Sequence, residues 1–118
     1  MSLLLVDDTV CILNVCKRFL NHFNIPYVAF DSCDKALEYY VKNSSGIVFV
    51  LTDVEMISGI NGVELTSQLK TINDKLPVYV MSGRADFASE AIKLGADKFF
   101  YKDNLMKIIQ SVASVFPR

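Results

Sequence analysis

Five short runs of apolar residues alternate along the chain with longer segments of mixed apolar and polar residues. The third and fourth runs are apolar almost throughout, which is typical of strands that are covered on both faces of a sheet. Gly, Pro, Asn and Ser residues separate several of the runs from the segments beside them, as expected at turns. We therefore predict strands at residues 3–6, 27–30, 47–52, 78–81 and 98–101.

Between these runs, apolar residues recur every three or four positions, which is the period of an amphipathic helix. Asn61 and Glu64 form a capping-box pair at one helix start, and Gly95 ends the fourth helix. The five predicted helices begin at or just after Thr9, Ser32, Asn61, Asp86 and Asn104. The side chains that we expect to face the core include Leu13, Cys16, Leu20, Ala36, Leu37, Tyr40, Val41, Leu65, Leu69, Ile72, Ile108, Ile109, Val112 and Phe116.

The alternation of five strands with five helices predicts the α/β class. Each right-handed crossover between parallel strands places a helix over the sheet, so that helices cover both faces. Periodicity does not give the strand order, and we expect the flavodoxin-like order 2-1-3-4-5 of a doubly wound five-stranded parallel sheet. Because a chain of 118 residues can bury about two-thirds of its unfolded surface in one core, we expect a single domain over residues 1–118.

Composition and charge argue against several classes of function. Twelve Lys and Arg against thirteen Asp and Glu give a net charge of −1, which offers no electrostatic footprint for nucleic acid or an anionic membrane. No apolar run approaches the roughly 18 residues of a membrane span, and the acidic start is unlike a secretory signal peptide. Cys11, Cys16 and Cys33 lack a metal-binding spacing and indicate free thiols. We predict a cytoplasmic protein without membrane insertion or a nucleic-acid partner, with Cys11 and Cys16 in the core.

Polar residues stand at the ends of four predicted strands. Asp7 and Asp8 follow the first strand, Asp53 the third, Ser82 the fourth and Lys102 the fifth. A single aspartate at a strand end commonly caps the next helix, but the ends of parallel strands meet at one edge, where these five side chains would converge. Clustered carboxylates repel one another unless a cation intervenes, and carboxylates are preferred ligands of Mg²⁺, which also binds phosphoryl oxygens. The pattern therefore predicts phosphoryl chemistry assisted by Mg²⁺.

Four segments, LLLVDD, VFVLTDVEM, PVYVMSGRAD and GADKFFYKDN, together resemble the receiver domain of two-component response regulators. The resemblance spans essentially the whole chain. It implies that Asp53 is the phosphoacceptor, that Asp8 ligates Mg²⁺ directly and that Asp7 assists through a water molecule. Asp53 and the main-chain carbonyl of Glu55 would be further Mg²⁺ ligands.

The same resemblance implies a conformational switch. Ser82 is similar to the hydroxyl residue that contacts the phosphoryl group, and Lys102 to the invariant lysine of the family. Phe99 stands at the aromatic switch position, where tyrosine is frequent. Phosphorylation of Asp53 would draw Ser82 inward and leave space for Phe99 to rotate. The surface of the fourth helix, fifth strand and fifth helix would then change for a partner protein.

Three features depart from the family pattern. Asp103 follows Lys102, and Ile57 follows Met56, where receiver domains usually have proline. The segment ISGING is one residue longer than the common pattern, in the loop that would border the metal site. Because a cis bond before a non-proline residue costs about 2.5–4 kcal/mol, we expect no cis peptide after Lys102.

Glu55 and Arg84 stand two residues after Asp53 and Ser82, at positions where receiver domains vary and tune the lifetime of the phosphorylated state. Their opposite charges suggest an ion pair across the site. Such a pair would hinder the water molecule that hydrolyses phosphoaspartate, so we expect Glu55 and Arg84 to prolong the phosphorylated state.

The resemblance implies a stand-alone receiver domain that catalyses only its own phosphorylation and dephosphorylation and is not a turnover enzyme. Its phosphodonor would be a histidine kinase or a histidine phosphotransfer protein, and its output a downstream protein or a phosphorelay. The alternative is a phosphorylation-independent pseudo-receiver that acts as an interaction module. A flavodoxin-like nucleotide or flavin site is disfavoured because no Gly-rich loop follows the first strand. A phosphatase is disfavoured because Glu55 stands where a second aspartate would be typical.

Overall fold

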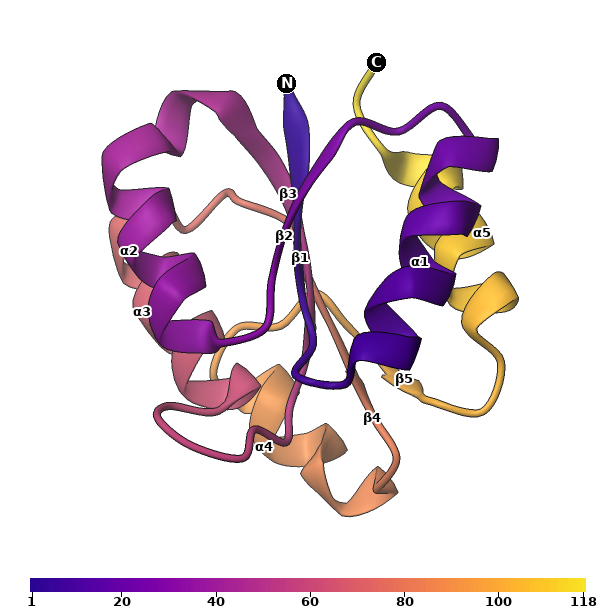
Figure 1. Ribbon diagram of the computed structural model, residues 1–118. Helices are drawn as coiled ribbons and strands as arrows, with labels where there is room; N and C mark the ends of the chain where they lie inside the picture. Colours follow the sequence, from indigo (N-terminus) through magenta and orange to yellow (C-terminus); the bar gives the residue numbers. More distant parts are fainter.

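The computed structural model describes residues 1–118, in which five strands alternate with five α-helices (Figure 1). The strands are β1 (Ser2–Val6), β2 (Tyr27–Phe30), β3 (Ile47–Asp53), β4 (Val78–Ser82) and β5 (Lys98–Tyr101). The helices are α1 (Val10–His22), α2 (Cys33–Asn43), α3 (Gly62–Ile72), α4 (Ala88–Lys93) and α5 (Leu105–Val115). Short 3₁₀ helices occupy Ser44–Gly46 and Ala85–Phe87. The predicted α/β class is confirmed.

All strand pairs are parallel, and the order across the sheet is β2-β1-β3-β4-β5. This is the doubly wound, flavodoxin-like order that we predicted. Val6 pairs with Thr52, so the ends of β1 and β3 lie side by side. Ser82 pairs with Tyr101 in the same way at the ends of β4 and β5. The residues that follow these strands therefore gather at one edge of the sheet. None of the helices is long and apolar enough to cross a membrane.

Helices cover both faces of the sheet. Figure 1 shows α1 and α5 on one side and α2, α3 and α4 on the other. In β1, Leu3 and Leu5 pack with the buried residues of α1 and α5, whereas Leu4 and Val6 pack with those of α2 and α3. All four side chains are fully buried. A strand with two covered faces needs apolar residues at every position, which explains the unbroken apolar runs in the sequence.

Three side chains that we expected in the core lie on the surface. Cys11 is exposed because it points away from the face of α1 that buries Leu13, Cys16 and Leu20. Val41 is 62% exposed and Ile72 is 51% exposed. Both lie near the C-terminal ends of their helices, past the last buried residue of each helix. The fourth helix also begins later than predicted, because residues Ala85–Phe87 form a 3₁₀ turn before it.

Candidate functional site

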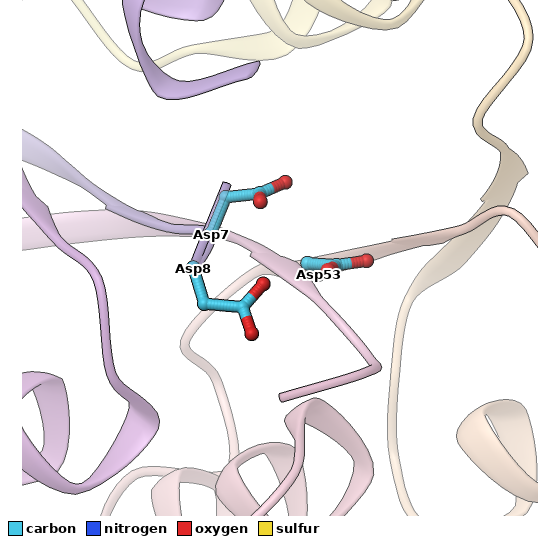
Figure 2. A group of neighbouring side chains, drawn as sticks. All are labelled: Asp7, Asp8 and Asp53. Carbon is cyan, nitrogen blue, oxygen red and sulfur yellow. The ribbon is translucent and has the colours of Figure 1, made fainter. Parts of the chain in front are cut away.

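The pairing of β1 with β3 brings three carboxylates together at the edge of the sheet. Asp7 and Asp8 follow β1, and Asp53 is the last residue of β3, one residue later than the predicted strand end. One oxygen from each of the three lies within 4.8 Å of the others, and Figure 2 shows the side chains projecting to the same side of the strand ends. Asp7 is fully buried and Asp53 is 4% exposed, whereas Asp8 is half-buried. The structure thus assembles the predicted acidic cluster.

Lys102 provides a positive charge within this cluster. Its Nζ lies 2.7 Å from Asp7 Oδ2 and 3.2 Å from Asp53 Oδ1. The main-chain N–H of Lys102 donates to the carbonyl of Ser82 at 2.7 Å, which holds the residue just beyond β5. Burial by itself would lower the pKa of Lys102, but the carboxylates of Asp7 and Asp53 raise it above its usual value. Lys102 is therefore a cation that bridges two carboxylates.

A single ammonium does not neutralise three carboxylates. Burial, followed by the charge of Asp7, raises the pKa of Asp53 to about 6, although Lys102 opposes the change. The buried Asp7 Oδ2 shares the Lys102 ammonium with Asp53 Oδ1. A bound cation would neutralise this excess negative charge. Asp7, Asp8 and Asp53 are thus a set of oxygen ligands that could bind a metal ion.

Asp8 is tied to the loop that follows β3. Its Oδ2 accepts a hydrogen bond of 2.8 Å from the main-chain N–H of Ile57. A proline, which the family resemblance led us to expect at this position, would have no N–H to donate. Asp34, at the start of α2, holds the other end of the loop, since its Oδ2 accepts from the N–H of Ile60 at 3.1 Å. The sequence did not single out these contacts, because a main-chain N–H has no signature in residue type.

The expected ion pair between Glu55 and Arg84 does not form. The Arg84 guanidinium instead binds Asp86, with Nη2 2.6 Å from Oδ2 and Nε 3.2 Å from Oδ1. This contact raises the pKa of Arg84 and lowers that of Asp86. Glu55 Oε1 instead accepts a hydrogen bond from the hydroxyl of Ser82 at 3.2 Å. The predicted pair of Glu55 and Arg84 is wrong because Asp86, only two residues from Arg84 in the chain, binds the Arg84 guanidinium in place of Glu55.

Ser82 and Phe99 lie on the adjacent strands β4 and β5. Ser82 is fully buried at the end of β4, and its Oγ also accepts from the main-chain N–H of Arg84 at 3.0 Å. Phe99, in β5, is partly buried and packs against the core residues on the side of α2, α3 and α4. The chain has no cis peptide bond, so the bond between Lys102 and Asp103 is trans.

The acidic cluster is open to solvent through a cleft at the edge of the sheet. This cleft is lined by Asp8, Thr9, Asp53, Glu55, Met56, Ile57, Gly83 and Lys102. Thr9 is the N-cap residue of α1, but its side chain makes no capping hydrogen bond. Its main-chain N–H donates to Asp7 Oδ1 at 2.9 Å and so holds that carboxylate in place. Because Asp53 and Lys102 both line the open cleft, a small anionic group could approach them directly.

Comparison with known proteins identifies the family. The family model described as the response regulator receiver domain matches residues 3–113. The chain is 32% identical over 117 residues to the two-component response regulator ARR21 of Arabidopsis thaliana, covering 96% of this chain and 19% of that protein. It is 30% identical over 112 residues to the transcriptional regulatory protein FixJ of Bradyrhizobium diazoefficiens, covering 90% of this chain and 53% of that protein. The chain thus spans about half or less of these relatives.

Solved structures show the same fold. A response regulator receiver domain protein from Clostridium thermocellum has a TM-score of 0.83 and 24% identity, with 96% of this chain and 94% of that chain covered. CheY of Borrelia burgdorferi, solved in a complex with CheX, BeF₃ and Mg²⁺, has a TM-score of 0.82 and 25% identity. That comparison covers 100% of this chain and 90% of the other. Together with the acidic cluster and the strand order, these matches show that the chain belongs to the response regulator receiver domain family.

Proposed function

We propose that this receiver domain is a signalling switch that accepts a phosphoryl group on Asp53. The observation that carries the proposal is the position of Asp53, which ends β3 beside Asp7 and Asp8 and contacts the Lys102 ammonium at 3.2 Å. The phosphodonor would be a phosphohistidine of a histidine kinase or a histidine phosphotransfer protein. CheY of B. burgdorferi, which shares the fold, has been solved with BeF₃ and Mg²⁺, and this supports a phosphoryl and metal site here.

Asp8 and Asp53 would hold Mg²⁺ directly, together with the main-chain carbonyl of Glu55, and Asp7 would assist through a water molecule. A bound Mg²⁺ would neutralise the crowded carboxylates and the oxygens of the incoming phosphoryl group. The raised pKa of Asp53 and the presence of three carboxylates around one ammonium support this assignment. We expect the affinity for the cation to fall when these carboxylates are protonated.

The transfer needs little from the protein beyond positioning and charge. A carboxylate oxygen of Asp53 would attack phosphorus, the phosphorus–nitrogen bond of the phosphohistidine would break, and the departing imidazole nitrogen would take up a proton. Lys102 would exchange its contact with Asp53 for one with a phosphoryl oxygen. Ser82 would turn its hydroxyl from Glu55 to another phosphoryl oxygen, leaving the switch residue Phe99 room to rotate.

The output would be a change in the surface formed by α4, β5 and α5. This surface carries exposed apolar side chains, among them Ile92, Leu94 and Tyr101. A partner protein that binds one arrangement of the surface more tightly would shift the population toward it.

Cys16 and Cys33 are buried free thiols, and burial raises the pKa of each to about 12. Free cysteines without disulfide bonds are typical of a reducing compartment, and we therefore propose the cytoplasm as the location of this switch.

Incubation with phosphoramidate or acetyl phosphate, with and without MgCl₂, followed by intact mass spectrometry, tests this proposal. We expect one added phosphoryl group with MgCl₂, little without it, and none in the Asp53→Ala variant. An adduct that persists in Asp53→Ala would assign the phosphoryl group to another residue. No adduct in the wild-type protein would instead support the alternative of a phosphorylation-independent interaction module.

A further inference from the structure

We propose that the loop of residues 57–60 is a positioning element for the metal site, acting through the main-chain N–H of Ile57 and anchored by Asp34. The proposal rests on the proposed function, because it concerns how Asp8 is prepared to bind a divalent cation. Neither Ile57 nor Asp34 would touch the cation. Each would act through the Asp8 carboxylate or through the loop that holds it.

The first contact fixes the orientation of Asp8. Asp8 Oδ2 accepts from the Ile57 N–H at 2.8 Å, a short bond between a charged acceptor and a main-chain donor. Figure 2 shows that the two oxygens of Asp8 diverge, one turned toward the other carboxylates and one turned away from them. Since Oδ2 already accepts this hydrogen bond, we infer that Oδ1 is the oxygen available to the acidic cluster. One oxygen of the Asp8 carboxylate is thus held by the loop, and the other would bind the cation.

The second contact fixes the loop itself. Asp34 Oδ2 accepts from the Ile60 N–H at 3.1 Å and ties the loop to the first turn of α2. Gly59 lies between the two contacts with φ +78°, and a Cβ at this position would collide with the Asp34 carboxylate. Asp34 can therefore approach the loop closely only because residue 59 is glycine. The loop is held at both ends by aspartates from other parts of the chain.

A metal ligand held by an outer hydrogen bond loses less freedom when the ion binds, and loss of such bonds typically weakens metal affinity about 10–100-fold. The same loop begins two residues after Glu55, whose carbonyl would be a further ligand. By reciprocity, a bound cation would stabilise the loop as much as the loop favours the cation. The Ile57 side chain is 91% exposed, so the contribution of this residue comes from its main chain.

Isothermal titration calorimetry with MgCl₂ alone can distinguish the contribution of the Ile57 main-chain N–H to Mg²⁺ affinity from that of the Ile57 side chain. Ile57→Pro removes the N–H, and we expect it to weaken Mg²⁺ binding about tenfold. Ile57→Ala keeps the N–H and should change the affinity less than twofold. Equal affinity of the two variants, or tighter binding by Ile57→Pro, would overturn the proposal. If the wild-type protein binds no Mg²⁺, the proposed function itself fails, which is a different outcome.

Ile57→Pro would also restrict the backbone of Met56, the residue before it. A second pair of variants, at Asp34, tests the loop without changing its sequence. Asp34→Ala removes the acceptor for the Ile60 N–H, whereas Asp34→Asn keeps an acceptor oxygen and removes only the charge. We expect Asp34→Ala to weaken Mg²⁺ binding roughly two- to fivefold more than Asp34→Asn, in line with the loss of one hydrogen bond. Equal affinities would show that the loop anchor does not support the metal site.

Amide hydrogen exchange measured by NMR without metal checks the contacts independently of binding. The amides of Ile57 and Ile60 should exchange more slowly than that of Ser58, whose N–H donates no hydrogen bond. Addition of MgCl₂ should slow the exchange at Ile57 further, while Asp8→Ala should abolish its protection. Unprotected Ile57 in the wild-type protein would contradict the proposal even if Mg²⁺ binds.

Discussion

The Ser82 hydroxyl donates a hydrogen bond to Glu55 Oε1 at 3.2 Å. The hydroxyl that we propose to contact the phosphoryl group on Asp53 is therefore already bound to a carboxylate. Ser82 is fully buried, and its Oγ also accepts from the N–H of Arg84. The hydroxyl has only one hydrogen to donate. A phosphoryl group on Asp53 must therefore compete with Glu55 for it.

Glu55→Ala should accelerate phosphorylation of Asp53 by phosphoramidate. The variant frees the Ser82 hydroxyl and removes a negative charge beside the path of the anionic donor, and we expect the rate to rise about three- to tenfold. Glu55→Gln keeps an acceptor oxygen without the charge, so its rate should lie between those of Glu55→Ala and the wild type. Glu64→Ala, on the exposed face of α3, is the control for loss of an acidic residue. If phosphoramidate phosphorylates Asp53 no faster in Glu55→Ala than in Glu64→Ala, Glu55 does not compete with the phosphoryl group for the Ser82 hydroxyl.

Arg84→Ala should alter the decay of the phosphorylated protein less than Glu55→Ala does. The Arg84 guanidinium is bound to Asp86 on the surface and has no ion pair with Glu55. Decay can be followed by intact mass after removal of the donor. An effect of Arg84→Ala that equals or exceeds that of Glu55→Ala would mean that the two residues pair once Asp53 is phosphorylated, as the sequence alone suggested.

Asp53→Asn should stabilise the metal-free protein at neutral pH. The pKa of Asp53 is raised from 3.8 to about 6 by burial and by Asp7, so the folded state binds this proton more tightly than the unfolded state does. Its contribution to stability is full below pH 3.8 and is lost as the pH rises through about 6. Removing the charge should therefore raise the free energy of unfolding at pH 7.5 by up to about 3 kcal/mol.

Urea unfolding of the wild type and Asp53→Asn at a series of pH values measures this effect. The difference in stability should be small near pH 4 and should grow up to about pH 7. MgCl₂ should stabilise the wild type more than Asp53→Asn, because the substitution removes a ligand and the excess charge together. A difference that does not depend on pH would mean that burial does not perturb Asp53.

Lys102→Ala should destabilise the metal-free protein by about 3 kcal/mol, because it leaves the buried carboxylates of Asp7 and Asp53 without their counter-charge. Lys107→Ala removes an exposed lysine at the start of α5 and should have little effect. MgCl₂ should recover more of the stability of Lys102→Ala than it adds to the wild type. Equal losses in the two variants, measured by urea unfolding, would show that Lys102 is not part of a buried charge network.

Gly62→Ala should disturb both the fold and the acidic cluster. A Cβ at Gly62 would meet the main-chain carbonyl of Asp53, and neither group can move without shifting the end of β3 or the start of α3. We expect a loss of about 3 kcal/mol or more in the free energy of unfolding. Gly46→Ala is the matched control, since nothing lies within 4 Å of a Cβ there. Similar stabilities of the two variants would contradict the close approach seen at Gly62.

The sequence by itself determined the fold class, the order of elements along the chain and the edge where the acidic residues gather. These conclusions rest on properties that many residues share, such as the apolar runs of β1 and β3 and the helical spacing of Ile108, Ile109 and Val112. Errors at single positions, such as Val41 and Cys11, do not change such patterns. The strand order needed knowledge of common α/β folds and a resemblance to a family, because periodicity alone does not specify which strands pair.

Only the tertiary structure decided which partner each polar side chain takes. Glu55 meets Ser82 across 27 positions of the chain, and Asp8 meets the Ile57 N–H across 49. Charge alone suggested that Glu55 would bind Arg84, yet Asp86 takes that guanidinium. A hydrogen bond depends on distance and angle to within a few tenths of an ångström, and these are set by the packing of separate elements. Hydrophobic burial has no such directional requirement, which is why the core was predictable and the contacts of the site were not.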